Sequence, residues 1–176
     1  MKVQALADLI TERSAPQQNF VGISSWALFF DGSACDTGCG VGLLIISPRG
    51  AQYEFAFCLS ERRTNNQTEY KALCKGLELL LEAGTEVVEA FGDSRVAINQ
   101  STEDFNCASD LLYPYLLRCQ ELMAKFRFVR LTWIPRENNL EANKLAQIAS
   151  GYVEQDDSVC IDVMPFDTGE PISSII

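Results

Sequence analysis

The chain has 176 residues, of which 47% are hydrophobic and 22% charged, and this size and balance indicate one globular domain with a sizeable core. Its net charge of −10 argues against a protein that binds nucleic acid through surface charge alone. Seven cysteines without a CxxC pair, together with the absence of histidine, argue against a zinc module and against a secreted scaffold stapled by disulfides.

The charge is unevenly distributed along the chain. Residues 153–176 hold six acidic residues and no Lys or Arg, residues 1–19 are balanced, and the span 20–152 therefore carries −4. We expect these three segments to be an acidic C-terminal tail, an N-terminal connector arm and one folded domain, respectively. No apolar run approaches the about 20 residues of a membrane span, and Lys2 and Asp8 interrupt the first ten residues. An intracellular protein, cytoplasmic or nuclear and without a membrane partner, is therefore expected.

Three short apolar segments at the start of the domain predict strands. Residues 24–30 are rich in aromatic side chains and lead into a DGS turn sequence, so a buried strand is expected to end at the carboxylate of Asp31. Residues 41–46 and 52–59 form the second and third expected strands, separated by a PRG turn. Together the three strands predict two linked antiparallel hairpins.

Helices and strands alternate in the rest of the domain. Over residues 66–83 apolar positions recur at helical spacing, and Gly84 closes the helix. Residues 86–91 then form a buried strand that stops just before Asp93. The remaining expected elements are helices over 95–100, 110–126 and 140–150 and a strand over 127–134. This order predicts an α/β domain with a mixed five-stranded sheet, three antiparallel hairpin strands followed by parallel strands, and helices on both faces.

Three acidic residues lie where these elements are expected to meet. Asp31 and Asp93 follow two buried strands, while Glu69 shares a helical face with apolar residues, so its carboxylate should point toward the sheet. No Lys or Arg adjoins Glu69 on that face, and grouped carboxylates repel one another unless they are protonated or share a cation. Oxygen-only ligands favour Mg²⁺ or Mn²⁺ over Zn²⁺.

A purely structural role is the alternative for each acid. An Asp that follows a strand and precedes Gly or Ser is commonly a turn residue or a helix cap without any chemistry. This interpretation competes well for Asp93 taken alone. A purely structural role explains less well why an inward-facing Glu69 is expected beside both Asp31 and Asp93. We therefore favour a metal-binding triad.

Four motifs in this order, FFDGSA, TNNQTEYKAL, FGDSRV and PRENNLEANKLAQIAS, resemble the motif set of ribonuclease H over about residues 22–152. The resemblance is strongest to the reverse-transcriptase-associated ribonuclease H domain of plant gypsy-type LTR retrotransposon polyproteins, where an arm like KVQALADLI joins the domain to the polymerase. It implies a ribonuclease H fold, an RNA–DNA hybrid as substrate, and reverse transcriptase and integrase domains as polyprotein partners. It also implies that Asp31, Glu69 and Asp93 are catalytic ligands of two Mg²⁺ or Mn²⁺ ions.

The fourth acid of the resembled motif is replaced in this chain. Asn143 stands where the family has Asp, so the resemblance makes it a catalytic metal ligand without charge, and one of the two ions should be held more weakly. Glu141 could substitute, but it points about 200° away around the helix axis, and Lys144 adds positive charge that disfavours metal binding. An engineered change from Asp to Asn would give the same sequence.

Residues expected to contact the substrate lie beside the acids. By resemblance, Thr64, Asn65 and Asn66 touch the backbone and minor groove of the hybrid, and Ser94 and Asn139 lie near it. Amide and hydroxyl groups at a helix start can read the shape and the 2′-hydroxyls of the wide minor groove without sequence preference. These residue types are also good N-caps, so binding would be additional to a structural role.

Two functions of different kinds follow from these observations. The leading one is a two-metal endonuclease that hydrolyses the RNA strand of RNA–DNA hybrids, with activity reduced by Asn143. The alternative is a catalytically weak or inactive domain that binds nucleic acid or protein. A transposase- or exonuclease-type relative of the same fold would need a different spacing of the acids and ranks last.

Overall fold

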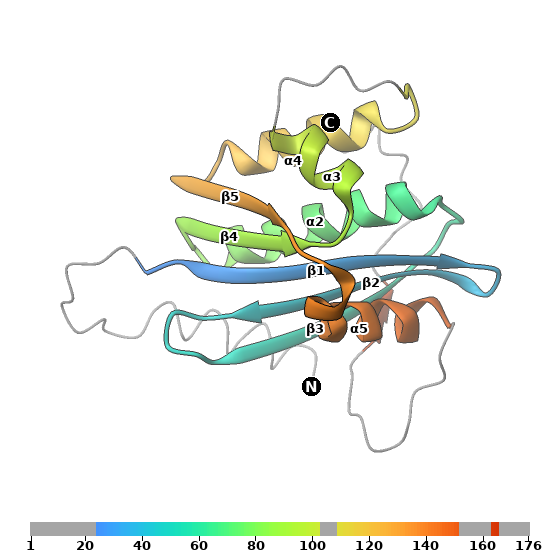
Figure 1. Cartoon of the computed structure of the whole chain (residues 1–176), viewed down its shortest axis with the longest axis horizontal. Coiled ribbons are helices and arrows are strands. Elements are labelled where there is room, and N and C mark those ends of the chain that lie inside the picture. Colours follow the sequence, from blue (N-terminus) through green and yellow to red (C-terminus); the bar gives the residue numbers. More distant parts are fainter. Residues whose placement is uncertain (1–23, 103–108, 152–162, 166–176) are drawn as a thin grey trace.

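A computed structural model describes residues 24–102, 109–151 and 163–165, with one six-stranded sheet at its centre (Figure 1). The sheet has the order β5-β4-β1-β2-β3-β6, and its strands are β1 (Trp26–Cys35), β2 (Gly38–Ile46), β3 (Gln52–Leu59), β4 (Val87–Gly92), β5 (Phe128–Trp133) and β6 (Val163–Pro165). Neighbours among β1, β2 and β3 are antiparallel, whereas β1, β4 and β5 run parallel. The predicted α/β fold with a mixed sheet is confirmed.

Two features of the sheet differ from the prediction. A short sixth strand, β6, pairs in parallel with residues 56–58 of β3, inside the segment for which we expected only a tail. In addition, β1 does not end before Asp31. Its parallel ladder with β4 stops at Phe29, but its antiparallel ladder with β2 pairs Asp31 with Gly42 and continues to Cys35. The expected connector arm and the rest of the expected tail lie outside the described residues.

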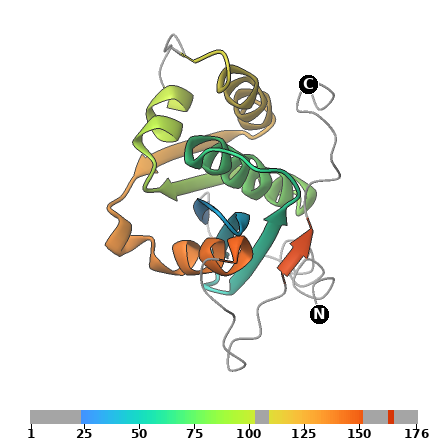
Figure 2. The same cartoon turned by 90° about the vertical axis from the view of Figure 1, so that its right-hand side faces the viewer.

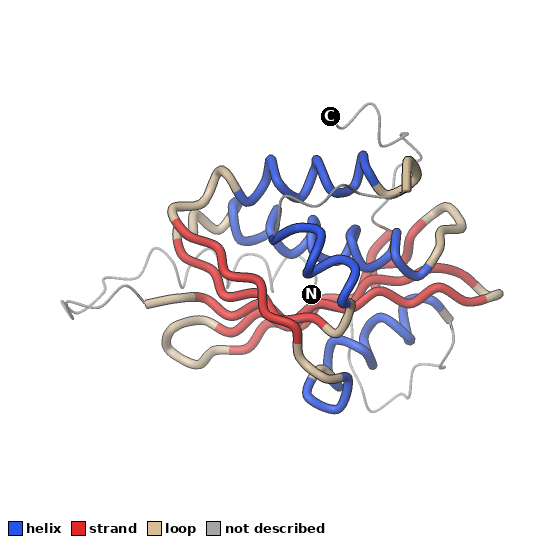
Figure 3. Tube along the Cα trace, turned by 45° about the horizontal axis from the view of Figure 1, so that its top comes forward, coloured by secondary structure: helices blue, strands red, loops and turns tan. Residues whose placement is uncertain are grey.

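Helices cover both faces of the sheet, as predicted (Figures 2 and 3). On one face, α2 (Asn65–Glu82) crosses β1 and β2, and α3 (Arg95–Thr102) and α4 (Tyr113–Met123) pack beside it. On the other face, the short turn η1 (Arg136–Asn138) leads into α5 (Leu140–Ser150), which lies across β2, β1 and β3. None of the described helices is long and apolar enough to cross a membrane.

The two faces are packed in different ways. Under α2 the fully buried side chains include Leu73, Leu77 and Leu80 of the helix and Leu28 and Phe30 of β1. Helix α5 instead lies directly on the backbone of β2, because a Cβ atom at Gly40 or Gly42 would overlap backbone atoms of the helix. This close approach brings Asn143 of α5 within hydrogen-bond distance of β1.

Candidate metal centre

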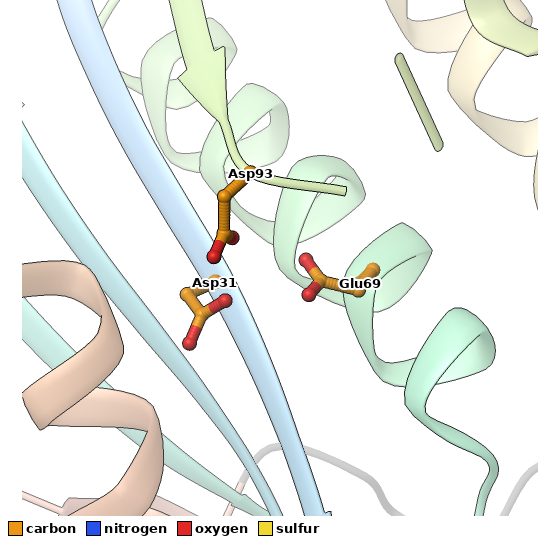
Figure 4. A group of neighbouring side chains, drawn as sticks. All are labelled: Asp31, Glu69 and Asp93. Atoms are coloured by element: carbon orange, nitrogen blue, oxygen red, sulfur yellow. The ribbon is translucent and has the colours of Figure 1, made fainter. Parts of the chain in front are cut away.

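Three carboxylates from three different elements point toward one another (Figure 4). Asp31 lies on β1, Glu69 on α2 and Asp93 directly after β4, and one oxygen of each lies within 4.8 Å of the others. Asp31 is only 1% exposed and Glu69 6% exposed. The three acids therefore converge, as the sequence predicted, although Asp31 does so from within a strand rather than from beyond its end.

The residues around Asp31 and Glu69 explain why these two acids meet. A Cβ atom at Gly32 would overlap the backbone of Thr68 and Glu69, so glycine lets the first turns of α2 lie directly on β1. The start of α2 is held by a capping box, in which the backbone N–H of Gln67 donates to Thr64 Oγ1 at 3.3 Å and the N–H of Thr64 donates to Gln67 Oε1 at 3.0 Å. Glu69 is thereby fixed one turn inside a well-anchored helix.

The electrostatics of the triad favour a bound cation. The pKa of Asp31 is raised to about 7, mainly by burial and secondly by the negative charge of Asp93. Burial and the charges of Asp31 and Asp93 likewise raise the pKa of Glu69 well above its ordinary value. Asp31 Oδ1 and Glu69 Oε2 are buried without a hydrogen-bond partner, which is costly for a carboxylate. An oxygen-only donor set with unpaired buried oxygens fits Mg²⁺ or Mn²⁺.

Asn143 also reaches the triad, from the opposite face of the sheet. Its amide Nδ2 donates to Asp31 Oδ2 at 2.9 Å. In this arrangement the amide is a neutral donor to Asp31, and only after the amide turns over would its oxygen face the same place as a ligand. Glu141 and Lys144 on the same helix are exposed, and neither belongs to the carboxylate group. Glu141 therefore does not replace the missing fourth acid.

Ser94 and Asn139, which we expected near the substrate, have internal partners in the structure. Asn139 is 1% exposed, and its Nδ2 donates to the carbonyl oxygen of Phe30 at 2.9 Å and to Asp93 Oδ1 at 3.4 Å. Ser94 Oγ accepts from the backbone N–H of Ala97 and so caps α3. Asn139 thus holds Asp93 against β1, and a contact of either residue with substrate stays a prediction.

The other three expected substrate residues lie at the exposed start of α2. Thr64 is the N-cap described above, and the Oδ1 atom of Asn65 accepts from the backbone N–H of Ala34 at 3.2 Å, which ties the helix start to the β1–β2 hairpin. Asn66 is exposed beside them. The three residues precede Glu69 by about one helical turn, and this position near the carboxylate triad is compatible with the expected contact to a nucleic-acid backbone.

Sequence reasoning missed Arg136, which bonds directly to the triad. Its Nε atom donates to Asp93 Oδ2 at 2.8 Å, and the indole N–H of Trp133 donates to the backbone oxygen of Asp93 at 3.1 Å. The lack of Lys and Arg along the face of α2 does not exclude a cation from another element. Parallel strands end at the same edge of a sheet, so residues that follow β5 lie beside those that follow β4, and this signal would have placed Arg136 next to Asp93.

A ribonuclease H fold with three convergent carboxylates defines the class of protein, and comparison with known proteins agrees. Residues 29–149 match the model of the family described as reverse transcriptase-like, and the chain belongs to this family. The crystal structure of RNase H1 from the archaeon Halobacterium salinarum is similar with a TM-score of 0.68 and 30% identity, covering 73% of this chain and 99% of that one. A ribonuclease H1 in complex with an RNA/DNA hybrid has the same fold, with a TM-score of 0.65 and 24% identity over 73% of this chain and 98% of that one.

Among curated proteins, ribonuclease HI of Halobacterium salinarum is 31% identical over 123 residues. The match covers 69% of this chain and 62% of that protein. The chain thus spans less than two thirds of this relative's length.

Proposed function

We propose that this protein is a metal-dependent endonuclease that hydrolyses the RNA strand of RNA–DNA hybrids. The observation that carries the proposal is the triad Asp31, Glu69 and Asp93, whose buried carboxylates converge and leave two oxygens unpaired on a ribonuclease H fold. The similarity to a curated protein named ribonuclease HI supports RNA–DNA hybrids as the substrate class. Such a group of acids is costly to a fold unless it serves a cation.

Different residues of the chain would have different roles at the proposed metal centre. Asp31, Glu69, Asp93 and Asn143 would hold two divalent ions, Mg²⁺ or Mn²⁺. If bound there, these ions would supply an activated water and positive charge near the phosphate. Asn139 keeps Asp93 in position through its amide. Thr64, Asn65 and Asn66 would contact the hybrid from the start of α2.

Asn143 makes the proposed enzyme a slow one. Its amide brings no negative charge, and its nitrogen faces Asp31, so an ion that depends on this position would be held weakly. The same observation favours the second candidate function, a weak or inactive domain that binds nucleic acid. We also keep, as proposals, an intracellular location and a place between reverse transcriptase and integrase domains in a retrotransposon polyprotein.

Cleavage of a labelled RNA–DNA hybrid with Mg²⁺ or Mn²⁺ tests the function. We expect cutting of the RNA strand alone, its loss in Asp31→Asn, and a gain of about tenfold in Asn143→Asp. Duplex DNA and duplex RNA of the same sequence serve as controls for the substrate class. If only Asn143→Asp cuts, the protein is a disabled nuclease and its function must be sought in binding. If Asn143→Asp is also inactive while the protein is folded, the nuclease proposal is wrong.

A further inference from the structure

Arg136 places a positive charge against an acidic group that we assign to metal ions. Both oxygens of Asp93 accept hydrogen bonds, Oδ2 from Arg136 at 2.8 Å and Oδ1 from Asn139 at 3.4 Å. Asp31 Oδ1 and Glu69 Oε2, in contrast, have no partner. An ion bound to Asp93 would therefore have to share this carboxylate with the guanidinium of Arg136.

The side chain of Arg136 lies largely in solvent. It is 67% exposed, whereas the side chain of Asp93 is only 4% exposed. Among the described residues, Asp93 is the only hydrogen-bond partner found for its guanidinium. A divalent ion on Asp93 would repel this guanidinium, because two positive charges would then compete for the same oxygen.

A second arginine stands beside the same loop. The guanidinium of Arg95 lies 4.3 Å from the ring centroid of Trp133, and the Trp133 indole bonds to the backbone oxygen of Asp93. Arg95 is exposed, so a second guanidinium group lies on the tryptophan that bonds to Asp93, in a chain with a net charge of −10. Guanidinium groups bind phosphate oxygens well because their planar donors match phosphate geometry.

We propose that Arg136 exchanges partners: it holds Asp93 while the metal centre is empty of ions, and it binds a backbone phosphate of the nucleic acid once an ion has taken Asp93. The phosphate half of this inference rests on the proposed function, whereas the metal half does not. Arg136 then lowers the affinity for divalent ions in the absence of substrate and raises the affinity for substrate when ions are present.

Two binding measurements on Arg136→Gln test the exchange. Calorimetry with Mn²⁺ alone should show affinity tighter by roughly threefold or more, because a competing positive charge is gone. Fluorescence anisotropy with an RNA–DNA hybrid and Ca²⁺ should show affinity weaker by roughly threefold or more, because a phosphate contact is lost. Arg130→Gln is the matched control, since it removes an equal charge from an exposed position over Phe128 and should leave the Mn²⁺ affinity unchanged.

The opposite signs of the two effects separate an exchange from a merely structural role. Unchanged or weaker Mn²⁺ binding in Arg136→Gln overturns the competition with metal, and unchanged hybrid binding overturns the phosphate contact. If the unaltered protein binds no hybrid, the proposed function fails, while the Mn²⁺ experiment still decides the metal half. Arg136→Lys, which keeps the charge, should retain the ordinary Mn²⁺ affinity and guards against a folding defect in the Gln variant.

Discussion

Helix α2 contributes side chains to both the apolar core and the carboxylate triad. In its middle turns Leu73, Leu77 and Leu80 are fully buried in the apolar core, and at its start Glu69 is nearly as buried within the carboxylate triad. Burial of the leucines stabilises the fold, whereas burial of the carboxylate raises its pKa and costs stability when it is ionised. Similar burial on one helix thus has opposite energetic signs, and the unpaired oxygen of Glu69 distinguishes the position that we propose to serve function.

The largest expected effect comes from removing the charge of the buried acid. Glu69→Gln should reduce hybrid cleavage by about 100-fold or more, because a metal ligand loses its charge. The same change should raise the free energy of unfolding of the metal-free protein at pH 8, since a penalised buried carboxylate disappears. Cleavage rates and urea unfolding in EDTA measure the two effects. A loss of both activity and metal-free stability would contradict the assignment.

The corresponding change in the apolar core should act on stability alone. Leu77→Ala removes a fully buried side chain and should lower the free energy of unfolding by about 2–5 kcal/mol. Mn²⁺ affinity of the folded variant should stay the same, because the triad lies a helical turn or more away. Urea unfolding and calorimetry test the pair of expectations. A marked loss of Mn²⁺ affinity would show that the two regions of α2 are coupled.

A smaller loss is expected where helices press on glycines. Gly42→Ala should lower the free energy of unfolding by about 1–3 kcal/mol, since the new methyl group would overlap the backbone of α5 at Ala142. Gly76→Ala is the matched variant on α2, where the atoms nearest to the methyl group belong to the side chain of Leu28 rather than to backbone, and helix propensity improves. Thermal unfolding should rank Gly42→Ala as the more damaging change, and the reverse order would exclude rigid packing of α5 on β2.

The smallest effect is a pH-dependent response to metal. The pKa of Asp31 is raised from 3.8 to about 7, so the stability associated with its protonated form is complete below about pH 4 and is lost as the pH rises through 7. Mn²⁺ should therefore raise the melting temperature by a few degrees at pH 8 and by less at pH 5, where protons compete for the carboxylates. Calorimetric melting with and without Mn²⁺ measures this, and an equal rise at both pH values would contradict it.

Local patterns in the sequence predicted the elements and the triad because periodicity and end signals are properties of neighbouring residues. The helix that carries Glu69 was predicted to within about one residue at each end, as Asn65–Glu82 in the structure. The sequence did not predict that Asp31 lies within its strand, because hairpin register depends on the pairing of Asp31 with Gly42 across the sheet. The DGS sequence there resembles a turn only when it is considered without its partner strand.

The parts of the site that the sequence did not predict are contacts between side chains far apart in the chain. Arg136 lies 43 residues after Asp93, and Asn139 lies 109 residues after Phe30, so no local pattern links these partners. The buried bonds of Asn139 and the ion pair of Arg136 follow from the order of β1, β4 and β5 in the sheet. The fourth motif, PRENNLEANKLAQIAS, contains both Arg136 and Asn139, but a motif does not identify the partners of its side chains.

The position of α5 in the chain determines when the centre can be completed during protein synthesis. Asp31, Glu69 and Asp93 precede β5, while Asn143 lies 112 residues after its partner Asp31. A growing chain therefore contains all three acids before the ribosome has made α5, the helix that contacts the triad from the other face of the sheet. Premature termination between residues 93 and 139 yields a product with the three acids but without Asn139 and Asn143, the amide side chains that bond to Asp93 and Asp31.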